Sequence, residues 1–152
     1  MANRKYEKYV ITKTPECPMY PRSKENNEYY NSWANTLWIN DGLNGAVKDA
    51  FYVDCILIWD KKWPDNTSHY HDFDEYLIFI GTDPKNPSDL GGEVELWLGD
   101  EKYIITKNTA VFVPKKLEHC PLKFHKVTRP FIFIRTGNTT KDLQPQTHHA
   151  GE

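Results

Sequence analysis

The residues with the most distinctive chemistry lie in one short segment, His69-Tyr70-His71-Asp72-Phe73-Asp74-Glu75. In a β-strand, side chains two residues apart point to the same face, so His69 and His71 share a face. Glu75 has the same parity and can join them directly or after a turn. Two imidazoles and one carboxylate converging from one segment predict a site for a first-row transition metal. The alternative interpretation is a pair of surface histidines beside an acidic loop.

A second segment supplies a candidate fourth ligand. The apolar run 109–113 is followed by Pro114 and then by His119. A strand, a proline turn and a histidine would bring this imidazole back toward the first three side chains. The four donors include no thiolate, which argues against a closed structural zinc site and suits Fe(II), Mn(II), Ni(II), Co(II) or Zn(II). We therefore expect one divalent transition metal, with Fe or Mn favoured, and two open positions on an octahedral ion.

Together the two segments resemble the motifs of the cupin superfamily. Cupin motif one reads G(x)5HxH(x)3,4E(x)6G. His69, His71 and Glu75 match its three ligands, and Gly81 closes it one residue early. The segment is also similar to the HxHDFDE stretch of small, single-domain, uncharacterised cupins.

Cupin motif two reads G(x)5PxG(x)2H(x)3N, and here Pro114 and His119 stand at the matching mutual spacing. The departures from this motif fall on turns and not on ligands: Asn108 replaces the first glycine, Lys116 the second, and Lys123 the final asparagine. The resemblance covers roughly residues 50–136. It implies a double-stranded β-helix, or jelly-roll barrel, whose interior holds a metal bound by three histidines and one glutamate.

The rest of the chain favours the same architecture. Short runs rich in β-branched and aromatic residues, separated by turn residues, predict strands: 33–39, 51–59, 75–80, 93–98, 103–106, 110–113 and 130–136. Only residues 45–50 could hold a short helical turn. We expect an all-β fold, with a cupin barrel over residues 33–137. An extended N-terminal arm (1–32) would pack on the barrel or on a partner, and residues 138–152 would form a polar tail.

Four further residues are candidates for substrate binding. Phe79 has the parity of Glu75, and Phe133 shares a face of the last strand with Arg135. An inward Arg135 could clamp a substrate carboxylate, because a guanidinium forks onto two oxygens. Tyr52 could donate a hydrogen bond to a substrate. The alternatives are core packing for the three aromatic residues and a surface charge for Arg135. No residue is assigned a catalytic role.

Composition excludes several classes of protein. The 152 residues suffice for one domain, and a formal net charge of −2 argues against a nucleic-acid-binding module. No apolar run is long enough to span a membrane, and the N-terminus lacks a secretory signal, so we expect a cytoplasmic location. Five tryptophans and the Tyr/Pro-rich arm suggest a homodimer.

Two classes of function fit these residues. The first is a metal-dependent enzyme acting on a small keto acid, hydroxy acid or carbonyl substrate, with lyase, decarboxylase or isomerase chemistry in which the metal is a Lewis acid. With Fe(II), the same site could serve a dioxygenase. The second class is a non-catalytic cupin that binds a small molecule. The presence of all four candidate ligands favours the enzyme.

Overall fold

The computed structural model describes residues 4–12, 27–39, 47–140 and 147–149. Within these ranges the regular structure consists of ten β-strands and one 3-10 turn, η1 (Glu7–Tyr9). No helix in the described part is long and apolar enough to cross a membrane. The prediction of an all-β fold is confirmed.

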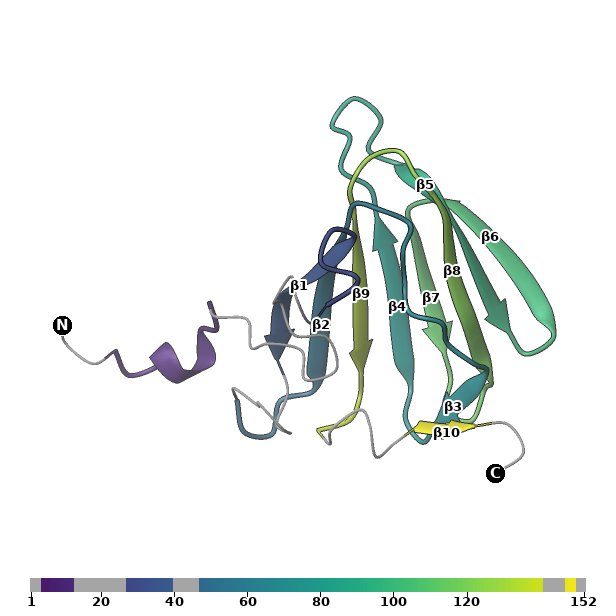
Figure 1. Ribbon diagram of the computed structural model, residues 1–152. Coiled ribbons are helices and arrows are strands. Elements are labelled where there is room, and N and C mark those ends of the chain that lie inside the picture. Colours follow the sequence, from purple (N-terminus) through teal and green to yellow (C-terminus); the bar gives the residue numbers. More distant parts are fainter. Residues whose placement is uncertain (1–3, 13–26, 40–46, 141–146, 150–152) are drawn as a thin grey trace.

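The strands form two five-stranded antiparallel sheets (Figure 1). Sheet A contains, in spatial order, β1 (Trp33–Ile39), β2 (Tyr52–Ile58), β9 (Phe131–Gly137), β4 (Glu75–Ile80) and β7 (Thr109–Val113). Sheet B contains, in spatial order, β10 (Thr147–His149), β3 (His69–His71), β8 (His119–Val127), β5 (Asp89–Leu98) and β6 (Glu101–Lys107).

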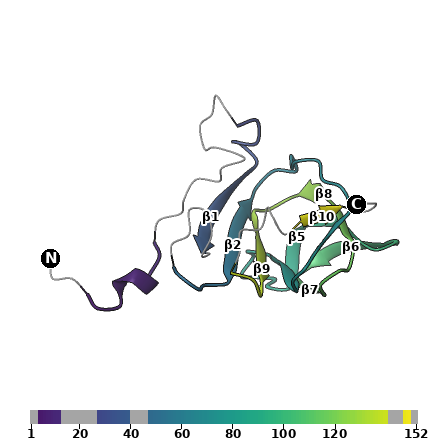
Figure 2. The ribbon, with the colours of Figure 1, turned by 90° about the horizontal axis from the view of Figure 1, so that it is seen from below.

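The chain passes repeatedly from one sheet to the other. β2, β4, β7 and β9 lie in sheet A, whereas β3, β5, β6 and β8 alternate with them in sheet B. Seen from below, the strands of both sheets surround a common interior (Figure 2). This winding is the double-stranded β-helix that the resemblance to cupins implies.

Alternating side chains fill that interior. In β2 the side chains at positions 52, 54, 56 and 58 are buried, and those at 53, 55 and 57 are half-buried. The same alternation in β4 and β9 directs one set of side chains into the core. Trp33 and Trp63 join this core, with ring centroids 5.0 Å apart. These two tryptophans therefore stabilise the barrel.

Some elements differ from the sequence-based expectation. β8 was not among the predicted strands, because Pro121 interrupts its alternation and proline is uncommon inside a sheet. β5 begins at Asp89, four residues before the predicted start. The polar tail contains β10, which pairs with β3.

The two terminal segments and the expected helical turn lie partly outside the described residues. Of the turn predicted over 45–50, residues 47–50 are described and close with a hydrogen bond from Ala50 N to Val47 O, 3.2 Å long. In the described part of the N-terminal arm, Tyr29 packs on Trp33, whereas Tyr6 and Tyr9 are exposed. Packing of the arm on a partner stays a prediction.

Candidate metal centre

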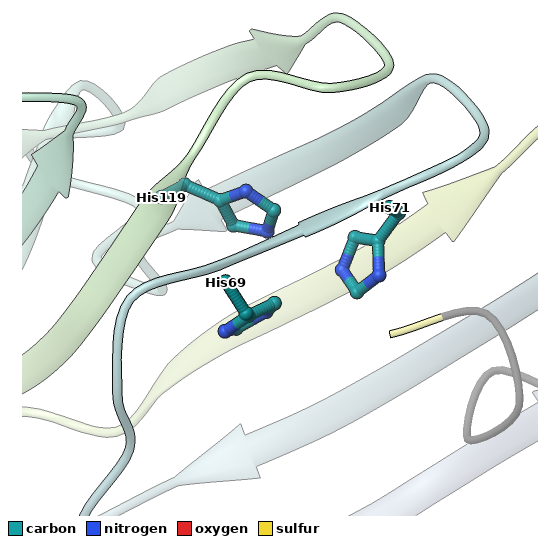
Figure 3. A group of neighbouring side chains, drawn as sticks. All are labelled: His69, His71 and His119. Carbon is teal, nitrogen blue, oxygen red and sulfur yellow. The ribbon is translucent and has the colours of Figure 1, made fainter. Parts of the chain in front are cut away.

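Three histidines from two neighbouring strands of sheet B converge on one point. β3 supplies His69 and His71, and β8 supplies His119, which is paired in register with His69. One ligand nitrogen from each ring can be chosen so that all three lie within 4.8 Å of one another. Figure 3 shows the rings turned toward a common space. Ligands bound about 2.1 Å from one ion lie up to about 4.2 Å apart, so a small contraction would suffice for coordination.

Glu75 reaches the same space from the opposite sheet. It is the first residue of β4, and its Oε1 lies 3.4 Å from His119 Nε2 and 3.8 Å from His71 Nε2. The four side chains that the sequence predicts as metal ligands are thus brought together. His71, His119 and Glu75 are buried, whereas His69 is half-buried and marks the more accessible side of the site.

Backbone carbonyls fix the protonation of two of the rings. His69 Nδ1 lies 2.8 Å from Thr67 O, and His119 Nδ1 lies 3.0 Å from Leu117 O. A carbonyl only accepts hydrogen bonds, so each Nδ1 carries a proton and, in a neutral ring, Nε2 carries a lone pair. These contacts are the usual outer support of a metal-binding histidine.

The environment of His119 Nε2 tests whether a cation fits. This atom is buried and makes no hydrogen bond of good geometry with any described residue. Its lone pair would face a carboxylate oxygen of Glu75, and two acceptors at 3.4 Å repel unless a positive charge lies between them. A divalent ion held by three imidazole nitrogens and one carboxylate oxygen would satisfy both atoms.

The carboxylate of Glu75 is kept ionised. Burial alone would raise its pKa. The contact with His119, the positive charge that His71 and His119 carry when protonated, and the Tyr52 hydroxyl outweigh burial and hold the pKa below its ordinary value in the metal-free chain. Tyr52 donates a hydrogen bond to Oε2 of Glu75. Burial, and then the charge of Glu75, raise the pKa of the Tyr52 phenol, so the phenol remains a donor.

Gly137 makes room for this contact. It is paired in register with Tyr52 on one side and with Glu75 on the other. A Cβ on Gly137 would lie 2.7 Å from Tyr52 Cε1 and 2.9 Å from the Phe73 ring. Phe73 in turn stacks on His71, with centroids 4.8 Å apart and planes inclined by 12°. The absence of a side chain at position 137 lets both aromatic rings pack beneath the ligands.

Arg135 points inward from β9 but is engaged by another residue. Its Nη2 donates to Oδ2 of Asp54, and its Nε donates to the same oxygen at 3.0 Å. Asp54 is buried and also accepts a hydrogen bond from the Asn35 amide. In the structure the guanidinium neutralises a buried carboxylate. Its role as a substrate clamp stays a prediction.

The remaining candidates for substrate binding lie in the core, and the Cys120 thiol beside His119 remains protonated. Phe79 and Phe133 are fully buried and stack on each other, with centroids 4.7 Å apart and planes inclined by 1°. Their contact with a substrate also stays a prediction. Burial, and then the charge of Glu75, raise the pKa of the Cys120 thiol to about 12, so this sulfur offers no thiolate near neutral pH.

Sequence reasoning missed the outer contacts of the site. The carbonyl groups of Thr67 and Leu117 have no sequence signature, because any residue can supply them. The pairing of Arg135 with Asp54 had one weak signal in the sequence, because Asp54 is the one charged residue on the inward face of β2.

No protein-family model matches the sequence, and no curated protein matches it. Similar solved structures include an oxalate oxidase, 13% identical, with 79% of this chain and 56% of that chain covered and a TM-score of 0.47. DMSP lyase DddQ from Ruegeria pomeroyi DSS-3 is 17% identical, with 81% and 54% covered and a TM-score of 0.45. A cupin 2 conserved barrel domain protein from Rhodopseudomonas palustris is 12% identical, with 66% and 57% covered and a TM-score of 0.44. This chain spans just over half the length of these three. The similarity concerns the fold alone.

Proposed function

We propose that the chain binds one divalent transition metal, with Fe or Mn favoured, through His69, His71, His119 and Glu75. We further propose that it is an enzyme acting on a small organic substrate that carries a carbonyl or carboxylate group. The observation that carries the proposal is the buried Nε2 of His119, which makes no hydrogen bond of good geometry with a described residue and faces the Glu75 carboxylate. Burying three imidazole nitrogens against a carboxylate lowers the stability of the folded chain unless a cation occupies the site.

The chemistry follows from the donor set and its burial. When bound, the metal supplies Lewis acidity toward a substrate oxygen, which supports lyase, decarboxylase or isomerase reactions. Tyr52 holds the Glu75 carboxylate in place, and Phe73 excludes water from the far side of His71. His69 is the least buried ligand, so we expect substrate to approach from its side.

Metal content is the first test. The full chain, purified without chelators, is analysed for Fe, Mn, Zn, Ni and Co, and is then titrated with each ion. We expect close to one ion per chain in the wild type. His71→Ala and His119→Ala each remove one of four ligands and should lose most of the metal. His125→Ala is the matched control, because His125 lies on the exposed face of β8. Full occupancy in both ligand variants would overturn the assignment.

Turnover is the second test. The metal-loaded chain is incubated with a panel of small keto acids, hydroxy acids and aldehydes. Product formation and dissolved oxygen are measured together. Lewis-acid chemistry predicts product formation without oxygen uptake, loss of activity with EDTA and recovery with one ion. Stoichiometric oxygen uptake would replace the proposal with a dioxygenase. Metal binding without turnover of any substrate would leave a binding protein.

A further inference from the structure

The outer face of sheet A carries no charge. Across β2, β9, β4 and β7, the outward side chains are apolar except for one threonine, and none is charged. The middle row of this face, aligned by strand pairing, contains Cys55, Ile134, Ile78 and Ala110. We call the outward side chains of these four strands the apolar face.

The outer face of sheet B is different. There the outward residues of β5 alternate with the core, and Glu95 accepts a hydrogen bond from Trp97 and lies 3.0 Å from His125. Lys102 and Lys123 add charges to the same side. An antiparallel sheet exposed to water normally shows this polar alternation, whereas strands with two apolar faces are typical of sheets covered on both sides. The outer face of sheet A therefore has the composition of a sheet face that packs against another protein surface.

Within the described part of the chain, a portion of the apolar face is open to solvent. Tyr76 and Phe112 are 46% and 50% exposed, and their rings lie 5.3 Å apart on neighbouring strands. Ile80, further along β4, is 36% exposed. Adjacent exposed aromatic side chains of this kind are typical anchors of protein interfaces.

The size and charge of the face indicate its occupant. Four strands spaced about 4.8 Å apart, with three outward residues on β2, β9 and β4 and two on β7, give a face of roughly 20 by 20 Å, or about 400 Å² in projection. A stable interface buries about 800 Å² of accessible surface per partner, with an apolar centre and a polar rim. The apolar face has the dimensions of such a centre. Because it is uncharged, a charged partner would lose hydration there without gaining an ion pair.

We infer that the apolar face packs against the same face of a second copy of this chain, forming a two-fold symmetric dimer. Such an interface is self-complementary, since each copy contributes the same uncharged surface. The inference does not depend on the proposed metal chemistry, because the apolar face and the ligands lie on opposite sides of sheet A. It proposes a contact for the homodimer in addition to the tryptophans and the N-terminal arm.

Sedimentation of the full chain across the micromolar range tests the inference. The wild type should sediment at twice the chain mass of 17.8 kDa. Phe112→Arg places a charge in the exposed aromatic pair of the apolar face and should weaken the dimer by about 100-fold or more. Ile104→Arg is the matched control, because Ile104 is 49% exposed on the outer face of sheet B. This control should remain dimeric.

A second readout keeps the test decisive if Phe112→Arg folds poorly. Cys55 lies in the apolar face, so its alkylation, followed by peptide mass spectrometry, should be slow in the wild type and faster after dilution. Tyr76→Lys should remove this dependence on concentration while thermal unfolding shows a folded chain. A wild type that is monomeric at high concentration would overturn the inference. Equal behaviour of Phe112→Arg and Ile104→Arg, or alkylation of Cys55 independent of concentration, would do the same.

Discussion

Inside the barrel, Tyr52 and Glu75 form a hydrogen bond between strands that are not neighbours, since β9 lies between β2 and β4. The Tyr52 hydroxyl donates to Oε2 of the carboxylate, which leaves Oε1 facing His71 and His119. One oxygen is thus held by a neutral donor, while the other is presented to the imidazoles. The phenol therefore sets the direction in which Glu75 offers its free oxygen.

Replacing Tyr52 with phenylalanine tests this relationship. Tyr52→Phe keeps the ring but removes the donor, so Oε2 of Glu75 loses its partner and the carboxylate gains freedom to rotate. We expect metal affinity to fall by about 10–100-fold, as is usual for supporting contacts of metal ligands. A competition titration against a chelator measures the change. Tyr76→Phe, on the exposed face of β4, should bind metal like the wild type. Unchanged affinity in Tyr52→Phe would mean that the phenol does not position Glu75.

Gly137 is expected to tolerate no side chain. In Gly137→Ala the new Cβ would lie 2.7 Å from Tyr52 Cε1, so the ring must move and its hydrogen bond to Glu75 must lengthen. We expect a loss of about 1–3 kcal/mol in the free energy of unfolding, together with weaker metal binding. Denaturant unfolding and metal titration measure the two effects.

Gly99→Ala is the comparison for this substitution. Gly99 has a φ of +58°, but a Cβ there meets no atom within 4 Å, so backbone strain is present without steric contact. It should cost about 1 kcal/mol and leave metal affinity unchanged. If Gly137→Ala behaves like Gly99→Ala in both unfolding and metal titration, the close approach of the Tyr52 ring to Gly137 does not affect metal binding.

The ion pair of Arg135 with Asp54 is expected to contribute to stability and to its pH dependence. Burial raises the pKa of the Asp54 carboxyl, and Arg135 and Asn35 reverse that rise only in part. Arg135→Met leaves the carboxylate buried without its cation and should cost about 3 kcal/mol at neutral pH. Because the folded-state pKa of Asp54 is raised, the contribution of this group to stability falls as pH rises above about 4, where unfolded Asp ionises. Denaturant unfolding at acidic and neutral pH measures both.

A double substitution separates charge from packing. Asp54→Asn with Arg135→Met removes both charges, so most of the lost stability should return and its dependence on pH should become flatter. If Arg135→Met alone is as stable as the wild type at neutral pH, the guanidinium is not neutralising Asp54. Arg135 would then be free for the clamp role.

Lys116 is expected to be a strained position. Its φ is +71°, and its backbone N–H donates to His71 O at 2.8 Å, so the turn that carries it also holds a ligand strand. Lys116→Val puts a β-branched side chain into a left-handed conformation and should cost about 1–2 kcal/mol relative to Lys116→Gly. Both variants lose the same exposed contact with Asp72, so that contact does not contribute to their difference in unfolding temperature. Equal temperatures would contradict this explanation.

Lys116 also shows which features of the site could be predicted from the sequence motif. The cupin motif has glycine at this position, and the departure to lysine left the left-handed backbone conformation in place. The candidate ligands were recognisable because strand parity directs His69 and His71 to one face without any knowledge of the rest of the chain. A proline and a histidine at the motif spacing then indicated His119.

Contacts between distant strands were beyond sequence reasoning. Tyr52 and Glu75 are 23 residues apart, and their hydrogen bond depends on the register of β2, β9 and β4. The sequence left open whether Arg135 faces inward or lies on the surface, and its partner Asp54 is 81 residues away. Register is set by the whole sheet, so side-chain parity was predictable and the pairing was not.

The weakest-held strand of the site is the one that carries two of its ligands. β3 is paired with β8 only at His69 and His119, and its other neighbour is the three-residue edge strand β10, whereas β5 and β8 are paired along most of their length. Such a strand opens locally at a lower free energy than the barrel unfolds, so its amide hydrogens should exchange quickly without metal. An ion shared by β3, β8 and β4 would slow that exchange by mass action. Hydrogen exchange at residues 69–71 would then report occupancy of the site separately from the stability of the fold.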